Sequence, residues 1–311
     1  MADPPFFSVV IPTYNRPQRL ADCLRSFLAL DYPRECWDLI VVNDGGEHSF
    51  DAINDDLKTQ LPLRLMTVAH AGPATARNQG AMIAEGTYLA FTDDDCRVDP
   101  KWLRSFADEF ARASYDALGG QLLNPSPDSI PAEAWTSYMR FLQDHLFRDP
   151  DGTLLLILSN NAAYRRDVFN CLGGFDERFP FAASEDTELG FRLVGNNYRQ
   201  GYCDQAKVWH YHHSSYPSYI KQQFRYGRGD YYFSEILKNP DYEVPERKSY
   251  SLVQFYQSLF DFLRSHHLPK RMSVLFIVTP FVYRVGISYE WVKNVLVKEV
   301  IDTFQKRNSA S

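Results

Sequence analysis

Residues 87–95, TYLAFTDDD, decide how the rest of this chain is interpreted. The run 87–92 is rich in apolar and aromatic residues and predicts a strand, and Asp93, Asp94 and Asp95 follow it directly. Three adjacent carboxylates repel one another, and a divalent cation such as Mg²⁺ or Mn²⁺, which prefers oxygen ligands, would resolve that repulsion. A solvated acidic turn is the alternative, and the triplet alone does not exclude it.

Strands and helices alternate around this run. Short apolar segments bounded by turn residues predict buried strands at 6–11, 39–42, 63–68, 87–92 and 116–122. Periodic segments that each begin at a proline predict helices at 17–30, 73–84 and 100–113. This alternation indicates an α/β fold with a mostly parallel sheet that is covered by helices on both faces.

Polar residues follow the predicted strands where each strand ends. Tyr14 and Arg16 come after the first strand and Asp44 after the second. In a parallel sheet these ends share one edge, where α/β folds bind ligands. Tyr14 could stack on a base, with Arg16 as a nearby cation and Asp44 as an acceptor for a ring or ribose donor. Alternatively, Tyr14 is an aromatic residue of the core and Asp44 is an ordinary turn residue.

Composition excludes several classes of protein. The chain has 311 residues and a net charge of −6, which argues against general nucleic-acid binding. No G-x-G-x-x-G follows the first strand and no G-x-x-x-x-G-K-[ST] occurs, so neither a dinucleotide-binding domain nor a P-loop is expected. The five cysteines are widely spaced, which favours a reduced, cytoplasmic setting, and the first residues do not form a signal peptide.

Several ordered segments resemble family 2 glycosyltransferases with the GT-A fold. They are VVIPTYNRPQRLADCLRSFL (9–28), LIVVNDGG (39–46), HAGPATARNQGAMIAEGTYLAFTDDDCRVDPKWL (70–103), NNAAYRRDVFNCLGGFDERF (160–179) and SEDTELGFRL (184–193). The resemblance covers roughly residues 6–213, about two-thirds of the chain. It implies a nucleotide-diphospho-sugar transferase with a GT-A catalytic domain at 1–215 and a C-terminal helical extension at 216–311.

The resemblance also implies roles for particular residues. The donor would be held by Pro12, Thr13, Tyr14, Arg16, Asp44, Arg77 and Asp94. Asp93 and Asp95 would be the first and second acids of the D-x-D motif, with Asp95 the better metal ligand. His210 would also lie near the metal, with His212 and His213 as competitors. A zinc site at these histidines is not expected, because no cysteine accompanies them.

Asp186 would be the catalytic base of this family, and its alternative role is to cap the helix that it begins. Glu185, Asn160 and Asn161 would contact the acceptor, although Glu185 could instead brace Asp186, and the asparagines could cap local turns.

The C-terminal third is predicted to be helical. A helix from Tyr216 would be interrupted at residues 227–229, and its Arg225 and Arg228 would reach a lipid diphosphate or the donor diphosphate, or form a solvated basic face. An amphipathic helix is expected at 249–266. The segment 272–300 is interrupted at Thr279-Pro280 and carries charges, so it is expected not to span a membrane. It would pack on the catalytic domain or a dimer partner, or lie in the membrane interface.

Together these features predict an inverting glycosyltransferase that depends on Mn²⁺ or Mg²⁺ and acts in polysaccharide or glycoconjugate biosynthesis. It would move one sugar from a nucleotide donor, a UDP-sugar, to a hydroxyl of a carbohydrate or lipid-linked acceptor. The Q-x-x-R-W string of processive relatives is absent. The expected location is cytoplasmic, peripheral on the inner face of the membrane. The alternatives are a nucleotide-sugar-binding or membrane scaffold without turnover and a haloacid-dehalogenase-type phosphatase. The phosphatase motif requires Thr or Val two residues after Asp95, where this chain has Arg97.

Overall fold

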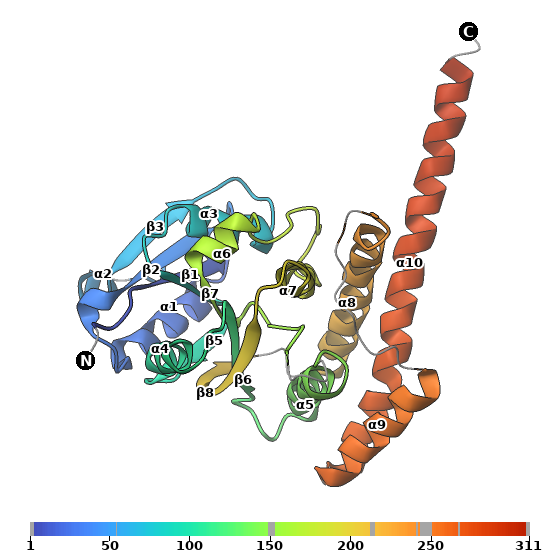
Figure 1. The fold of residues 1–311 in the computed structure, drawn as a ribbon. Helices are drawn as coiled ribbons and strands as arrows, with labels where there is room; N and C mark the ends of the chain where they lie inside the picture. Colours follow the sequence, from blue (N-terminus) through green and yellow to red (C-terminus); the bar gives the residue numbers. More distant parts are fainter. Residues whose placement is uncertain are drawn as a thin grey trace.

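A single mixed sheet forms the centre of the molecule. The computed structural model describes residues 3–53, 55–148, 153–211, 215–240, 242, 251–266 and 268–308. Within them the eight-stranded sheet has the order β3-β2-β1-β4-β7-β6-β8-β5 (Figure 1). The strands are β1 (Phe7–Thr13), β2 (Trp37–Asn43), β3 (Leu63–Thr67), β4 (Tyr88–Thr92), β5 (Cys96–Val98), β6 (Ala117–Leu123), β7 (Asn161–Arg165) and β8 (Gln200–His210).

The direction of the strands changes beyond β4. β1 to β4 pair in parallel, as the strand–helix alternation predicted. β7 is antiparallel to both β4 and β6, and β5 is antiparallel to β8. The short strands β5 and β7 were not predicted, because three and five residues carry too little periodicity to be recognised. β7 begins at the edge of the sheet where β4 ends, so that Thr92 lies opposite Asn161.

Helices cover both faces of the sheet. They are α1 (Pro17–Ser26), α2 (Asp55–Gln60), α3 (Pro73–Met82), α4 (Trp102–Arg112), α5 (Ile130–His145), α6 (Arg166–Cys171), α7 (Glu185–Gly195), α8 (Tyr216–Ile236), α9 (Leu252–Ser265) and α10 (Lys270–Asn308), with short 3₁₀ turns η1 (Phe27–Ala29) and η2 (Arg34–Cys36). Successive residues of β1 face opposite cores: Val9 packs with α1 and α4, and Val10 packs with α3, α6 and α7. The fully buried β1 is therefore apolar along most of its length.

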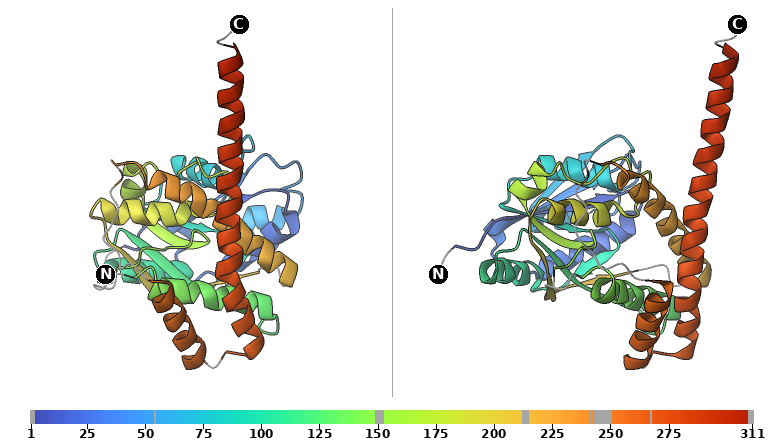
Figure 2. Two further views of the ribbon diagram at one scale, coloured as in Figure 1. Left: turned by 90° about the vertical axis from the view of Figure 1, so that its right-hand side faces the viewer. Right: turned by 45° about the vertical axis from the view of Figure 1, so that its right-hand side comes forward.

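The C-terminal helices build a second apolar core against α5. Trp135 and Tyr138 of α5 meet Phe262 of α9 and Phe276 of α10 there. α8 and α10 lie side by side, and α10 projects well beyond the rest of the molecule (Figure 2).

Glycines let α8 and α10 approach closely. α8 is continuous, so the interruption expected at residues 227–229 is wrong. A Cβ on Gly227 would overlap the carbonyl oxygen of Tyr283, and one on Gly286 would overlap that of Phe224. The glycines therefore serve a close helix crossing rather than a break in the helix.

α10 is also continuous, with Pro280 inside it. By length and composition α10 could cross a membrane, because an 18-residue stretch within Lys270–Leu296 has a mean hydropathy of 1.4; Thr279-Pro280 and the charges, on which the opposite expectation rested, do not interrupt the helix. One side of this helix nevertheless packs on the protein. The fully buried Glu290 pairs with Arg228 at 2.6 Å and accepts a hydrogen bond from Tyr232 at 2.7 Å.

We predict that Gly227→Ala destabilises the protein. Helix propensity alone would favour alanine by about 1 kcal/mol. The overlap with Tyr283 should outweigh that gain, since overpacking typically costs about 1–3 kcal/mol. Urea unfolding should therefore show a lower free energy of unfolding, whereas Lys221→Ala, on the exposed side of α8, should change little. A Gly227→Ala variant as stable as the parent would show that the two helices are not in close contact.

Candidate active site

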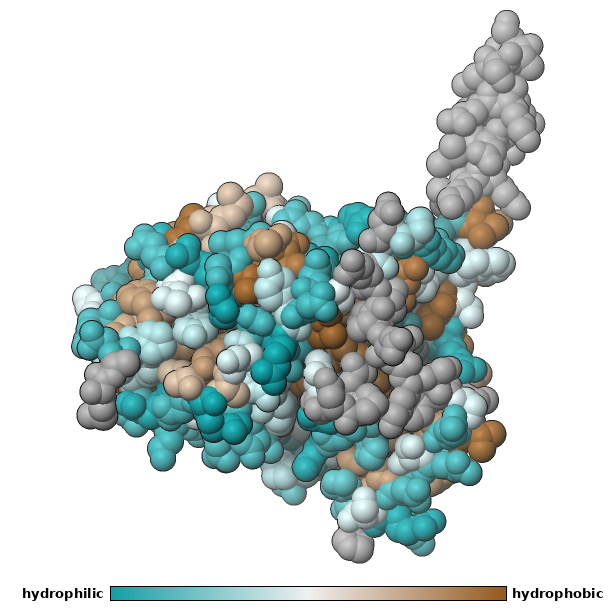
Figure 3. Space-filling model, viewed as in Figure 1, coloured by the Kyte–Doolittle hydropathy of each residue, from teal (hydrophilic) through white to brown (hydrophobic). Residues whose placement is uncertain are grey.

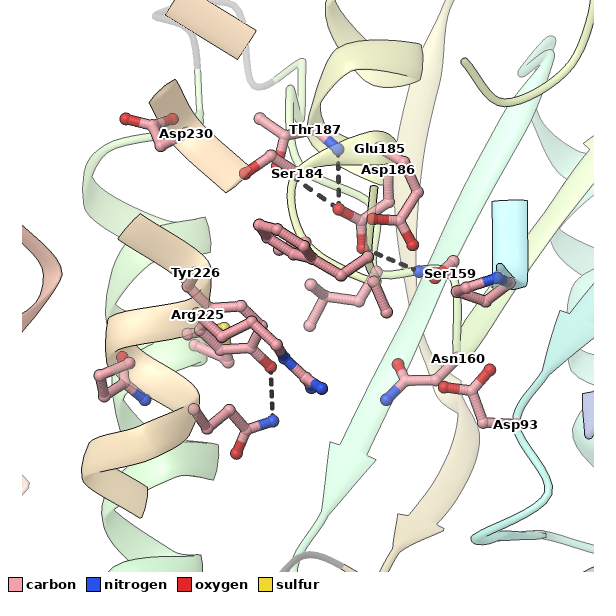
Figure 4. Close-up of a pocket in the computed structure, with 18 of the residues that line it drawn as sticks. Asp93, Ser159, Asn160, Ser184, Glu185, Asp186, Thr187, Arg225, Tyr226 and Asp230 are labelled. Carbon is pink, nitrogen blue, oxygen red and sulfur yellow. Dashed lines mark hydrogen bonds between the residues drawn. The ribbon is translucent and has the colours of Figure 1, made fainter. Parts of the chain in front are cut away.

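A cleft of about 1350 Å³ opens at the carboxyl ends of β1, β2 and β4. It continues past the start of α7 to the C-terminal helices (Figure 4). Twelve of the residues predicted from the sequence line it: Pro12, Thr13, Tyr14, Arg16, Asp44, Arg77, Asp93, Asp94, Asp95, Asn160, Glu185 and Asp186. The convergence of strand ends on one crevice, inferred above from the alternation of elements, therefore occurs.

One end of the cleft forms an aromatic platform. The ring of Tyr14 stacks on that of His70, with centroids 4.5 Å apart. The buried Asp44 carboxylate accepts hydrogen bonds from the backbone N–H groups of Ala71, at 2.8 Å, and Gly72, at 3.0 Å. Asp44 thus holds the loop that carries His70 beside Tyr14. His70 was not singled out from the sequence, although it lies two residues after a predicted strand.

Arginines neutralise the aspartate triplet. Thr13 Oγ1 donates to Asp94 Oδ2 at 2.8 Å. Arg16 bridges Asp94 and Asp95 at 3.1 and 3.2 Å, and Arg19 reaches Asp95 at 3.0 Å. Burial raises the pKa of Asp94 to about 6. The sequence argument assigned this neutralisation to a metal and missed Arg19, which lies one helical turn after Arg16.

Asp95 and His210 provide ligands that suit a hard divalent cation. Asp95 Oδ1 lies 3.2 Å from His210 Nε2. Burial raises the pKa of Asp95, but the neighbouring His210, Arg16 and Arg19 lower it by more. The pKa of Asp95 therefore lies well below its usual range. Cys96 lies close to both, but burial raises the pKa of its thiol well above the ordinary value, which disfavours a thiolate ligand. A carboxylate oxygen and an imidazole nitrogen suit Mn²⁺.

The second contact of His210 also fits metal binding. Its Nδ1 lies 3.0 Å from Asn160 Nδ2, while the buried Asn160 Oδ1 has no hydrogen-bond partner among the described residues. Rotating the Asn160 amide by 180° would let Oδ1 accept a hydrogen bond from Nδ1–H, which favours the tautomer whose Nε2 carries the lone pair that a cation needs. Metal-bound histidines commonly have such a partner. His212 and His213 lie outside the described residues.

Arg77 connects the acids that follow β4 with those that begin α7. It lines the cleft, as predicted, but only 2% of its surface is exposed. It pairs with Asp93 at 2.6 Å and with Glu185 at 3.2 Å. Its guanidinium is occupied by two acids, so the donor contact that the resemblance implied would have to compete with these pairs. A cation buried between them offsets the cost of placing carboxylates there.

Asp186 sits in the first turn of α7, after Ser184 in a left-handed conformation with φ of 70°. Its carboxylate accepts hydrogen bonds from Ser159 N at 3.2 Å and Thr187 N at 2.8 Å, and it faces the cleft (Figure 4). Burial raises the pKa of Asp186. Burial, and to a smaller extent the charge of Asp186, raises the pKa of Glu185 to about 7. The hydrogen bond from Thr187 N fits the alternative role of Asp186, which is to cap the start of α7. Asp186 nevertheless also lines the cleft.

Asn161 is not at the cleft. Its amide nitrogen donates to the carbonyl oxygens of Gln121 and Ala206, and its oxygen accepts from Trp102 Nε1 at 2.8 Å. These bonds use the side chain to join strands to α4, so the predicted acceptor contact does not fit. Asn160, its neighbour, points to the opposite side of β7 and does line the cleft.

The fold and the cleft define a class of protein: a GT-A fold with a cleft at the carboxyl ends of its parallel strands. The model of the family described as Glycosyl transferase family 2 matches residues 8–173, and the chain belongs to this family. It is therefore a glycosyltransferase, as its sequence motifs predicted. This assignment removes the phosphatase and the scaffold as alternatives for the family.

Curated relatives carry related descriptions. The chain is 25% identical to the glycosyltransferase AglE of Haloferax volcanii, over 72% of this chain and 73% of AglE. It is 27% identical to the glucosyl-dolichyl phosphate glucuronosyltransferase of the same organism, over 54% of this chain and 55% of that protein. With the O-antigen biosynthesis protein RfbC of Myxococcus xanthus it shares 28% identity over 68% of this chain and 18% of RfbC. The chain thus spans less than two-thirds of the last two.

Solved structures share the fold. The mannosyltransferase PcManGT from Pyrobaculum calidifontis, in complex with GDP-Man and Mn²⁺, has a TM-score of 0.59 at 15% identity, covering 96% of this chain and 87% of that one. S. aureus TarS 1–349 in complex with UDP has a TM-score of 0.53 at 19% identity, covering 92% and 89%. The GT-A fold is confirmed by this likeness.

We predict that Arg77→Met destabilises the protein in a pH-dependent way. Removing one partner of a buried ion pair costs about 3–5 kcal/mol. Without Arg77 the pKa of Glu185 should rise further above its ordinary value. Such a group favours folding when it is protonated, so the loss should be largest above pH 7 and smaller near pH 5.

Urea unfolding at pH 8 and pH 5.5 tests this. Adding Glu185→Gln to Arg77→Met should recover part of the loss at pH 8, because the more deeply buried of the two carboxylates that lost Arg77 is then neutral. Arg25→Met, on an exposed pair, is the control. An equal loss at both pH values would contradict the role given to Glu185.

Proposed function

We propose that this chain is an inverting, metal-dependent glycosyltransferase that moves one sugar from a UDP-sugar to an acceptor hydroxyl. The observation that carries the proposal is the position of Asp186, a partly buried carboxylate that faces the same cleft as Asp95. A base on one side of a bound sugar and cations on the other side are what a single in-line displacement requires.

In the proposed step the acceptor oxygen attacks C1 of the donor sugar opposite the diphosphate. The bond between C1 and the phosphate oxygen breaks, and its electron pair leaves with the nucleoside diphosphate. Asp186 takes the hydroxyl proton, and general-base catalysis of this kind is typically worth about 10²–10⁴-fold. Its raised pKa strengthens it as a base compared with a free aspartate.

The donor would occupy the end of the cleft near β1 and β2. The stacked pair of Tyr14 and His70 offers a face for the base, and Asp44 keeps that face in place. Asp94 would contact the sugar. Solved relatives in the same fold contain GDP-Man or UDP-GlcNAc, which supports a nucleoside-diphosphate sugar as the donor class.

A divalent cation, Mn²⁺ or Mg²⁺, would be held by Asp95 and His210, with Asp93 as a further candidate ligand. Bound there, it would act as a Lewis acid on the leaving diphosphate. Arg16 and Arg19, which now pair with Asp95, would then be free to neutralise the same diphosphate.

The C-terminal helical region 216–311 would place the catalytic domain 1–215 on the inner face of a membrane. Hydrophobic side chains are exposed along α10 (Figure 3), at three- and four-residue spacing: Val274, Ile277, Phe281, Val285, Tyr289, Val292 and Leu296. Glu290 is the only acid between 270 and 296, and it is buried, whereas Lys270, Arg271, Arg284 and Lys293 are exposed. This surface complements anionic lipid, while a homodimer through it would bring like charges together.

Asp186→Asn should abolish transfer, with a loss of at least about 10²-fold in kcat, because the amide cannot accept the hydroxyl proton. Binding of the UDP-sugar with Mn²⁺, measured by calorimetry, should stay within about twofold of the parent. Asp167→Asn, an exposed carboxylate outside the cleft, is the matched control. Loss of donor binding with full transfer at saturating donor would contradict the assignment of the base.

Removal of metal should stop transfer, and Mn²⁺ should restore it after EDTA treatment, because the leaving diphosphate needs the additional charge. In electron paramagnetic resonance titrations, Asn160→Ala should weaken Mn²⁺ binding about 10–100-fold by releasing the His210 ring. Asn124→Ala, outside the cleft, should not. Full transfer in EDTA would refute the dependence on metal.

A further inference from the structure

The cleft is larger than a nucleotide sugar requires. Pockets for drug-sized ligands commonly have about 300–1,000 Å³, and this cleft has about 1350 Å³. The additional space lies beyond Asp186, between α5, α8 and α10. We call this part the outer half of the cleft. In the arrangement proposed above, it is where the acceptor would lie.

Apolar side chains form most of the wall of the outer half. α5 contributes Tyr138, Met139, Leu142 and Leu146, whose spacing places them along one side of the helix. α9 contributes Phe255, and α10 contributes Pro280, Tyr283 and Ile287. Such a wall suits a hydrocarbon chain and offers few partners for the hydroxyl groups of a free oligosaccharide.

Two arginines in the outer half have no ion-pair partner within the described part of the chain. They are Arg225 on α8 and Arg284 on α10, and both line the cleft. Figure 4 shows Arg225 extending into the cleft toward Asn160. By contrast, Arg16 and Arg77 in the donor half each pair with two acids. Asp230 of α8 is the one acid that the described parts of α5, α8, α9 and α10 contribute to the lining, so with Arg225 and Arg284 the outer half keeps a net positive charge for an anion.

The third arginine of this region is occupied. Arg228 pairs with Glu290 and lies over the ring of Phe181, so the sequence-based expectation that it reaches a diphosphate does not fit.

A second observation also indicates a polar ligand in the outer half. Gln223 is 1% exposed and lines the cleft, and its Nε2 has no hydrogen-bond partner among the described residues. An amide N–H that lacks a partner inside a protein is costly unless a ligand or water accepts from it.

We infer that the acceptor is an amphiphile: a phosphate group binds Arg225, Arg284 and Gln223, and a hydrocarbon chain lies along the apolar wall toward the exposed side of α10. This inference rests on the transferase activity proposed above and names the class of its acceptor. The chain would reach the cleft from the surface on which Phe281 and Ile277 are exposed. The donor diphosphate is the other anion that these arginines could bind, and the experiment separates the two.

Binding of dodecyl phosphate below its micelle concentration tests the inference, with the fluorescence of Trp135 in the cleft wall as one reporter and calorimetry as a second. The full chain is loaded with UDP and Mn²⁺ so that the donor half is filled. Dodecyl phosphate should bind at least about tenfold more tightly than inorganic phosphate or dodecyl maltoside, which lack the chain or the charge. Shortening the chain to octyl should weaken binding by up to about fourfold per methylene.

The variants assign the anion. Arg284→Gln should weaken dodecyl phosphate binding about tenfold and leave the affinity for UDP within twofold. Arg271→Gln removes the same charge from an exposed position on the same helix outside the cleft and should change neither affinity. Equal binding of dodecyl phosphate and dodecyl maltoside, or a weaker affinity for UDP in Arg284→Gln with unchanged dodecyl phosphate binding, would overturn the inference.

The readout is binding, so it does not depend on turnover. A chain that binds dodecyl phosphate as expected but transfers no sugar would refute the proposed function and keep the amphiphile site. A chain that transfers sugar but shows no preference for dodecyl phosphate would refute only the acceptor class.

Discussion

The structure depends on bringing five carboxylates to one edge of a sheet and keeping them there. Asp93, Asp94 and Asp95 arrive from β4, while Glu185 and Asp186 arrive from α7. Unpaired, these groups would repel one another in a partly buried cleft. Arg16 and Arg19 hold the triplet, and Arg77 joins Asp93 to Glu185. The same cations therefore stabilise the fold and set the distance between the acids proposed to bind the metal and the proposed base.

The second determinant of the cleft is the contact between α8 and α10. Gly227 and Gly286 allow a close crossing, and the buried Glu290 with Arg228 locks it. This crossing closes the outer half of the cleft and leaves the other side of α10 apolar and exposed. The helix that lines the acceptor site is thus also the one that would meet a membrane, so that one element would couple membrane attachment to acceptor entry.

Much of the donor half was predictable because its residues follow strands in local motifs. Tyr14, Asp44 and the triplet each come directly after a strand, and a parallel sheet gathers such positions without any knowledge of side-chain contacts. The partners of these residues were not predictable. His70 stacks on Tyr14 from another loop, and Arg77 faces acids 16 and 108 residues away in sequence. Such contacts carry no local periodicity.

The sequence alone determined the class of protein: the α/β alternation, the edge of the sheet that carries the chemistry, and the acids that could do it. These follow from hydrophobic period and strand-end position, which are local properties of the chain. The tertiary structure alone decided which way each side chain is used. It turned Asn161 into a brace and Asn160 into a cleft residue, enclosed Arg77 between two acids, and left Arg225 and Arg284 without acidic partners among the described residues. Neighbouring or similar residues differ in this way because burial and partner geometry, which only packing sets, decide where a polar group's hydrogen bonds go.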